Sequence, residues 1–346
     1  MTQNIAIRRL TEADLERADQ IVREAFSSHL QISPADFAPG HDLAEHFWVE
    51  PEGAFGAFDN DELAGVMFAT IWGSFGFFGP LCVSSAHWNK GIAQLLLSET
   101  DKYFELKQVR TTGLYTFADS AKHIRLYERF GYHTQMLTAN LAKKLPESRL
   151  NAIDNILVPA ENANNCFPLV IEESPPPRGE LVLKLLSKMD AKDLSNAVAD
   201  MDQLTNETFP GLSLAREAIN SVPSTNGNQK FIAETLLVYE DGTLKAFAIC
   251  PLPPSNAAEK SVYAKFGIAK SHGGTDDFDL LLRGLERYAQ LIGASKIRAS
   301  TNTARRICYQ RMLLHGYQAE GYGIALIRPD TVAYNRPDVF VLDDWR

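Results

Sequence analysis

Apolar residues along this chain follow two different periods, and the changes between them mark out its elements. Continuous or alternating apolar runs, which are typical of strands, cover 5–10, 54–58, 63–71, 75–83, 112–117 and 137–143. Between these runs, stripes close to the 3.6-residue period predict helices that begin near Leu15, near Ile92 and at Ala121. A shorter helix is expected at 42–47. The first 145 residues are therefore expected to form an α/β domain.

The same pattern starts again in the second half of the chain. Asp190-Ala191-Lys192-Asp193-Leu194 repeats Thr11-Glu12-Ala13-Asp14-Leu15, and Gly316-Tyr317 follows Gly131-Tyr132 at an offset of 185 residues. Strands are expected at 235–239, 244–250, 261–268 and 296–300, and helices at 278–292 and 304–314. Matching elements in matching order predict a tandem repeat of one fold. The apolar tail at 340–345 is expected to dock on the second domain.

A segment of different composition separates the two halves. Residues 146–180 mix asparagines with prolines and include Pro175-Pro176-Pro177, which favours an extended spacer. We therefore predict three parts: a domain at 1–145, a linker at 146–180 that includes a strand near 153–158, and a second domain at 181–346.

Charge and cysteine usage exclude several classes of function. The chain has 346 residues and a net charge of −9 without a basic stripe, so no nucleic-acid partner is expected. Its four cysteines are scattered, which is typical of free thiols in the cytoplasm and predicts no metal site. The uncharged span Leu63–Trp88 is long enough to cross a membrane, but its glycines and Pro80 predict a buried hairpin instead. No leader is recognised at the N-terminus. A cytoplasmic protein without membrane contact is expected.

The turn after the apolar run 75–83 carries the strongest chemical signal. It reads Trp88-Asn89-Lys90-Gly91-Ile92-Ala93 and leads into a helix. A strand, a glycine turn and a helix N-terminus together direct free backbone N–H groups and a positive dipole end at one point, where a phosphate binds. Gly91 and Ala93 leave the approach open, and Lys90 adds a positive charge. An ordinary strand-to-helix turn is the alternative for this segment alone.

Two motifs in this order resemble the GCN5-related N-acetyltransferase (GNAT) family. Trp88-x-x-Gly91-x-Ala93 is similar to the family's pyrophosphate loop, Arg/Gln-x-x-Gly-x-Gly/Ala, except at its first position. Downstream, Leu126-Tyr127-Glu128-Arg129-Phe130-Gly131-Tyr132 is similar to the family's Leu-Tyr-x-x-x-Gly-Phe segment. The resemblance implies an α/β fold with two tandem GNAT-like domains, each a mixed, mostly antiparallel sheet flanked by helices.

The resemblance also implies a cosubstrate and roles for single residues. Acetyl-CoA would donate the acetyl group, with no metal involved, and would bind to Trp88, Asn89, Lys90, Gly91, Ile92 and Ala93. A backbone N–H within Leu81, Cys82 and Val83 would stabilise the acetyl oxygen. Tyr127 would protonate the departing thiolate, since its unperturbed pKa is near that of a thiol.

Other roles stay open at the level of sequence. Ser120 would contact the coenzyme arm, although its type and place equally fit the N-cap of the helix beginning at Ala121. His123 is a weaker candidate for the site. The strand at 75–85 offers no carboxylate or histidine, so the base is either relayed through water or one of Glu45, His46 and Asp119.

These observations predict an N-acetyltransferase whose N-terminal domain acetylates a primary amine by direct attack. The acceptor is a small molecule or a peptide, and a homodimer is left open. A non-catalytic acyl-CoA-binding or interaction module is the alternative, because the central strand lacks a base. The second copy is interpreted as degenerate, since Asp276-Asp277 stand where a phosphate would bind. Its Asn302 and Tyr309 are compared with Ser120 and Tyr127.

Overall fold

The computed structural model describes residues 5–39, 44, 46–146, 166–168, 180–219, 222, 233–252, 260–271, 274–343 and 345. They form two compact units, one ending at Leu114 and one beginning at Tyr115, and each is described by itself. Most of the predicted linker, with the strand expected near 153–158, lies outside the described residues, as does Glu45.

The first unit follows the predicted order of elements closely. Its strands are β1 (Ile5–Arg9), β2 (Ala54–Asp59), β3 (Glu62–Trp72), β4 (Phe75–Val83) and the first part of β5 (Thr111–Phe117). Its helices are α1 (Leu15–Leu30), α2 (His46–Val49) and α3 (Ile92–Leu106), with 3-10 turns η1 (Glu12–Asp14), η2 (Pro34–Asp36), η3 (Pro51–Gly53) and η4 (Ser85–His87). The strands β1 to β4 are antiparallel neighbours, whereas β4 and β5 are parallel.

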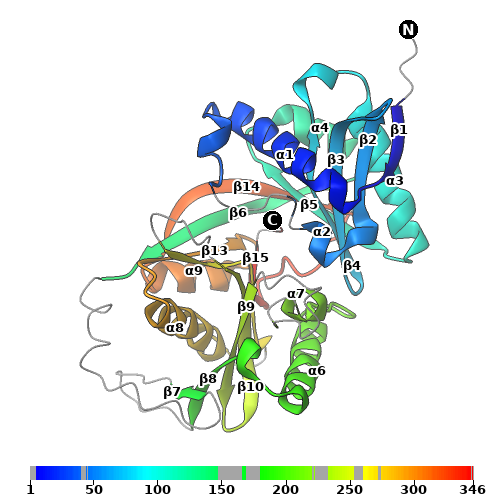
Figure 1. Ribbon diagram of the computed structural model, residues 1–346. Helices are drawn as coiled ribbons and strands as arrows, with labels where there is room; N and C mark the ends of the chain where they lie inside the picture. The colour runs from blue at the N-terminus through cyan, green and yellow to red at the C-terminus, as the bar shows by residue number, and fades with distance from the viewer. Residues whose placement is uncertain are drawn as a thin grey trace. The chain divides into compact units, whose positions relative to one another are not determined.

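Alternate residues of β3 face opposite helices, as the two-residue period of a strand requires. Val66 and Phe68 are buried with Ile21 and Val22 of α1. On the other face, a Cβ added to Gly65 would lie 3.1 Å from Ile92 Cγ2, on α3. The uncharged span Leu63–Trp88 is thus the β3–β4 hairpin between two helices, as predicted, and Figure 1 shows this hairpin.

The second unit contains a six-stranded sheet in the order β15-β12-β10-β9-β8-β7. These strands are β7 (Cys166–Pro168), β8 (Leu181–Leu185), β9 (Ala233–Glu240), β10 (Thr243–Pro251), β12 (Phe266–Ala269) and β15 (Phe340–Asp343). The helices of this unit are α4 (Ala121–Glu128), α6 (Ala191–Thr208), α7 (Ala215–Ile219), α8 (Asp276–Leu291) and α9 (Arg306–Leu314), with the 3-10 turn η6 (Leu186–Lys188). The strand β7 lies inside the predicted linker and pairs with β8.

Four further strands of this unit join the two halves of the sequence. They are β6 (His133–Lys144), β11 (Ser261–Ala264), β13 (Lys296–Asn302) and β14 (Gln318–Arg328). The strand β6 pairs antiparallel with both β13 and β14, and β13 pairs in parallel with β11. Figure 1 shows β6 and β14 as two long strands side by side. A strand from the first half of the sequence therefore lies between two strands from the second half.

Three local expectations were wrong. The run expected as one strand at 261–268 is two strands, β11 and β12, interrupted at Lys265. The long strand β14 was not expected at all. The apolar positions at the helical period that predict the helix near Ile92 include Leu95, which is 44% exposed rather than buried.

Within the described residues, no helix combines the length and apolar character that crossing a membrane requires. The cytoplasmic location stays a prediction.

Candidate coenzyme site and its second copy

The turn between β4 and α3 has the backbone geometry that its glycine predicts. Asn89 and Gly91 have positive φ angles of 61° and 80°, and Gly91 is the N-cap of α3. A Cβ added at Gly91 would meet nothing within 4 Å. Glycine is thus needed here for its φ angle, since the space around it is open. Trp88, Asn89, Lys90 and Gly91 are exposed, whereas Ile92 is buried beneath the turn.

The amides at the start of α3 have the arrangement that attracts an anion. The first intrahelical bond runs from Leu95 N to Gly91 O, at 3.2 Å, so the amides of residues 92–94 precede the ladder. No side chain caps this helix, and its first turn carries no acidic residue. The dipole and the amides therefore act on the space in front of Gly91 without a carboxylate in the first turn of α3 to oppose them.

Trp88 fastens this turn to the end of β4. Its indole Nε1 donates a hydrogen bond of 2.7 Å to the carbonyl oxygen of Val83, while the side chain is 45% exposed. The family motif has Arg or Gln at this position, and here the indole performs a structural role that the motif comparison alone does not reveal. A tryptophan N–H can only donate, which suits a strand-end carbonyl.

A second contact, between a histidine and a carboxylate, connects the same turn to the end of β2. His87 of η4 is buried, and its Nε2 lies 3.3 Å from Asp59 Oδ2 at the end of β2. No sequence pattern indicates this pair, because its members are far apart in the chain and belong to no motif. The turn 84–91 is thus held at two points before any ligand binds.

The three strand residues predicted to contact the coenzyme lie side by side on β4. Leu81, Cys82 and Val83 pair with Met67, Val66 and Gly65 of β3. Cys82 is buried in the core against α1, and burial raises the pKa of its thiol to about 12. Its side chain is therefore unreactive, and only its backbone could serve a ligand.

Ser120 and Tyr127 lie at opposite ends of α4, in the second unit. Ser120 occupies the N-cap position, but its hydroxyl makes no cap bond and instead lies 2.8 Å from His123 Nδ1. The expected side-chain cap is therefore absent, and His123 is the partner of Ser120. Tyr127 is buried at 7% exposure, and its carbonyl accepts the amide of Tyr132 at 3.2 Å, which closes the helix before the bend at Gly131.

Two titratable side chains of α2 and its C-terminal end are buried in the first unit. His46 is buried, with its ring centroid 6.1 Å from that of Phe68 on β3 and 6.4 Å from that of Phe77 on β4. Glu50, one turn later, is also buried, and its amide bonds to His46 O at 3.1 Å. Sequence reasoning named His46 and missed Glu50, although their spacing of four residues was a usable signal. Asp119, by contrast, is exposed.

The second copy can be aligned with the first from its parallel ladder. The ladder β4–β5 begins with Phe75 and Thr111, and the ladder β11–β13 begins with Ser261 and Lys296. The next helix starts ten residues after Thr111, at Ala121, and ten residues after Lys296, at Arg306.

This alignment corrects the sequence comparison of the two copies. Tyr127 corresponds to Met312, and Ser120 corresponds to Arg305, both of which are fully buried. The register that matched Asn302 and Tyr309 to them was wrong by three residues. The second copy has no tyrosine at the position of Tyr127.

The start of α8 also differs from the start of α3. Its first turn contains Asp276, Asp277 and Asp279, as expected for a helix N-terminus that carboxylates stabilise. Burial raises the pKa of Asp277. Residues 272–273 of this loop lie outside the described part of the chain.

Comparisons with known proteins agree with this fold. Residues 16–132 match the model of the acetyltransferase (GNAT) family. This segment of the chain is therefore similar to the GNAT family. A search of curated protein sequences found no match.

Solved structures resemble the whole chain. A Pyrococcus horikoshii protein described as a candidate acetyltransferase has a TM-score of 0.60 at 12% identity, with 98% of this chain and 94% of that one covered. A GCN5-related N-acetyltransferase from Sphaerobacter thermophilus has a TM-score of 0.53 at 14% identity, over 94% and 95%. A tandem GNAT protein from the clavulanic acid biosynthesis pathway has a TM-score of 0.55 at 10% identity, over 94% and 98%. At these identities the likeness concerns the fold, which is that of tandem GNAT proteins.

Proposed function

We propose that this protein is an acetyl-CoA-dependent N-acetyltransferase that acts on a primary amine in its N-terminal domain. The observation that carries the proposal is the uncapped, carboxylate-free start of α3 behind the Gly91 turn, inside the segment that matches the GNAT family. The amides that precede the helical ladder, together with the exposed side chain of Lys90, suit the pyrophosphate of coenzyme A. The acceptor is a small molecule or a peptide, and its identity is not encoded in the fold.

The reaction that follows is a direct transfer. The lone pair of the amine attacks the thioester carbonyl carbon, and a backbone N–H of residues 81–83 stabilises the oxyanion. The carbon–sulfur bond then breaks, the thiolate takes a proton from the hydroxyl of Tyr127, and the amine nitrogen releases its own proton. His46 and Glu50 are the buried candidates for receiving that proton, directly or through water.

The test of the coenzyme site uses two variants of one residue. Gly91→Glu should lose at least 100-fold in affinity for coenzyme A in calorimetry, since a carboxylate then stands at the pyrophosphate position. Gly91→Gln has the same shape and the same unfavourable positive φ, a cost of about 1–2 kcal/mol, without the charge. It should retain more affinity than Gly91→Glu. Undiminished affinity in a folded Gly91→Glu protein would reject this turn as the coenzyme site.

An acyl-CoA-binding module without catalysis is the second candidate. The observation that favours it is the absence of a carboxylate or histidine on β4, whose thiol at Cys82 is buried. Turnover of acetyl-CoA with a panel of primary amines separates the two candidates. Release of free coenzyme A that depends on the amine supports the transferase, whereas binding without release supports the module.

A further inference from the structure

One edge of the central strand in the second copy is paired along its whole length. Residues 261–264, as β11, pair in parallel with β13, whereas residues 266–269, as β12, pair antiparallel with β15 at the C-terminus. The opposite edge of β12 pairs with β10. The chain therefore leaves β13 at Lys265 and takes the C-terminal strand as its new neighbour.

The paired residues of β12 are the counterparts of the predicted coenzyme-binding strand. Counted from the starts of the two parallel ladders, Leu81, Cys82 and Val83 correspond to Gly267, Ile268 and Ala269. These three residues pair with Leu342, Val341 and Phe340. The backbone groups that a coenzyme would contact in this copy are thus paired with the protein's own chain.

The absence of a side chain at Gly267 lets β12 and β15 pack closely together. A Cβ at this position would lie 3.0 Å from Leu342 Cδ1 and 3.2 Å from Leu342 Cβ. The tail residues Phe340 and Leu342 belong to the main core of the unit, and Phe340 stacks on Phe278 of α8 at 5.6 Å between ring centroids. The tail is therefore integrated into the core, as the sequence analysis expected of it.

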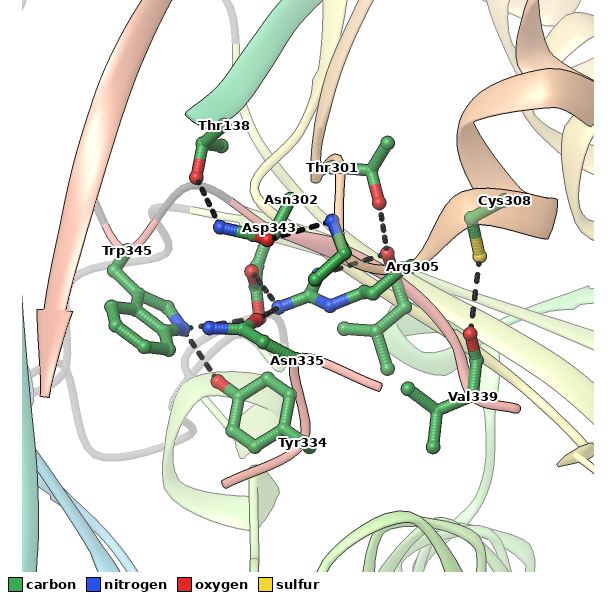
Figure 2. A network of polar contacts seen from close by, with 12 residues as sticks. Thr138, Thr301, Asn302, Arg305, Cys308, Tyr334, Asn335, Val339, Asp343 and Trp345 are labelled. Carbon is green, nitrogen blue, oxygen red and sulfur yellow. Dashed lines mark hydrogen bonds and ion pairs between the residues drawn. The ribbon is translucent and has the colours of Figure 1, made fainter. Parts of the chain in front are cut away.

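A buried polar network holds the tail from the side of β13, as Figure 2 shows. Thr301 of β13 and Arg305 both donate to the carbonyl oxygen of Val341, each at 3.0 Å. Arg305 also forms an ion pair of 2.8 Å with Asp343, in which the two side chains are 0% and 4% exposed. Trp345 Nε1 donates to Asp343 Oδ2 at 3.2 Å.

Arg305 lies at the position that corresponds to a predicted coenzyme-binding residue of the first copy. Arg305 corresponds to Ser120, which the family resemblance places at the coenzyme arm. In the second copy the same N-cap position carries a cation that binds the C-terminal strand. A buried arginine and aspartate are costly unless they are paired, so the tail and Arg305 each require the other.

We propose that β15 is the permanent occupant of the second coenzyme position, so that the chain binds one coenzyme, in its N-terminal copy. The tail takes the strand edge, the side-chain donors and the apolar volume that a ligand would need. That this position corresponds to a coenzyme site rests on the proposed function. That β15 fills it rests on the contacts described above.

Hydrogen exchange of the full-length protein, followed by mass spectrometry, tests the proposal. Peptides covering 266–269 and 340–345 should exchange slowly, and saturating coenzyme A should leave their rates unchanged. Protection by coenzyme A should appear in the first copy, at 81–95 and 120–127. Faster exchange of 340–345 on adding coenzyme A would overturn the proposal, because the ligand would then be displacing the tail.

Two matched substitutions test the anchor. Asp343→Asn leaves Arg305 buried without its counter-charge and should speed exchange of 266–269 and 340–345 together, by at least tenfold. Asp338→Asn is the control, since Asp338 lies two residues before β15, pairs with Arg336 at 3.2 Å and is 68% exposed. It should leave both peptides unchanged. Equal effects of the two variants would contradict a specific anchor at Arg305.

If Asp343→Asn does not fold, Thr301→Val replaces it, because it removes only one hydrogen bond to Val341. It should speed exchange of the same two peptides, and an unchanged rate would contradict the proposal. If the proposed function is wrong, coenzyme A should protect no peptide of the protein. The exchange rates of 266–269 and 340–345 in the variants would still test whether β15 occupies the second position.

Discussion

At the scale of single residues, Tyr127 is the residue whose chemistry the proposal uses most directly. It is buried on α4, one turn before the bend at Gly131. If its hydroxyl protonates the thiolate, Tyr127→Phe should lower kcat by roughly 10²–10⁴-fold with little change in the KM for acetyl-CoA. Steady-state kinetics with a responsive amine measures both constants.

A second tyrosine provides the control for loss of a buried hydroxyl. Tyr103 on α3 is 3% exposed, and its hydroxyl has no hydrogen-bond partner among the described residues. Burial raises the pKa of Tyr103 to about 12. Tyr103→Phe should keep wild-type kcat. Wild-type turnover in Tyr127→Phe would remove this residue from the mechanism.

At the scale of elements, the two copies differ in the acidic residues at the start of the helices α3 and α8. The helix α3 offers open amides, whereas α8 carries three aspartates that stabilise its own N-terminus. One of them, Asp279, also joins α8 to α9, with Arg311 Nε at 2.9 Å and His315 Nε2 at 3.0 Å from its Oδ1. An aspartate in the first turn of α8 thus also contributes to packing between helices.

This link makes the stability of the second unit depend on pH. Burial alone would raise the pKa of Asp279, but hydrogen bonds from His315 and Arg311 outweigh it and lower that pKa below its ordinary value of 3.8. A lowered pKa in the folded state means that the contribution exists above the unfolded pKa and is lost as pH falls through the folded one. Asp279→Asn should therefore cost about 1–3 kcal/mol of unfolding free energy at pH 7.

Urea denaturation at pH 7 and at pH 3 measures this effect, with Asp276→Asn as the control. Asp276 lies in the same first turn and is exposed, so its loss should cost only about 0.3–1 kcal/mol, the helix-dipole contribution. The difference between wild type and Asp279→Asn should shrink at pH 3. A difference that is equally large at both pH values would contradict the assignment to the ionised carboxylate.

At the scale of the whole molecule, the two halves of the sequence share a sheet. The strand β6 lies between β13 and β14, and the amide of Leu145 bonds to Ser295 O at 2.8 Å. Lys143 of β6 also forms an ion pair of 2.5 Å with Glu286 of α8. The domain limits at 1–145 and 181–346 therefore remain predictions. The strand β6 belongs to the first half of the sequence, but it pairs with strands of the second half.

Strand sharing predicts the behaviour of a cut chain. A protease site inserted within 147–165 should, after cleavage, give two fragments that elute together from a size-exclusion column under native conditions. Separation should require denaturant, because it would expose both edges of β6 and its buried residues Ala139 and Leu141. An intact 147–165 insertion variant is the control. Fragments that separate without denaturant would contradict the role of β6 in joining the halves.

Local sequence patterns were enough to predict the class of the fold and the backbone geometry of the turn at 88–93. Local periodicity placed β4 at 75–83 and the start of α3 at Ile92, and a glycine where φ must be positive marked the turn. Such features depend on residues that are close together in the sequence, so they can be recognised without knowing which distant segments pack against them. The resemblance of residues 88–93 and 126–132 to one family then supplied the chemistry.

The sequence indicated that the second copy differs at Asp276-Asp277, but the contacts of its C-terminal strand became visible only in the folded structure. The anchor of the tail joins Arg305 to Asp343 and Thr301 to Val341, and no period or motif links these positions. The same holds for the indole of Trp88 on Val83. Pairing between distant segments depends on the register of the assembled sheets, and local sequence patterns carry no information about that register.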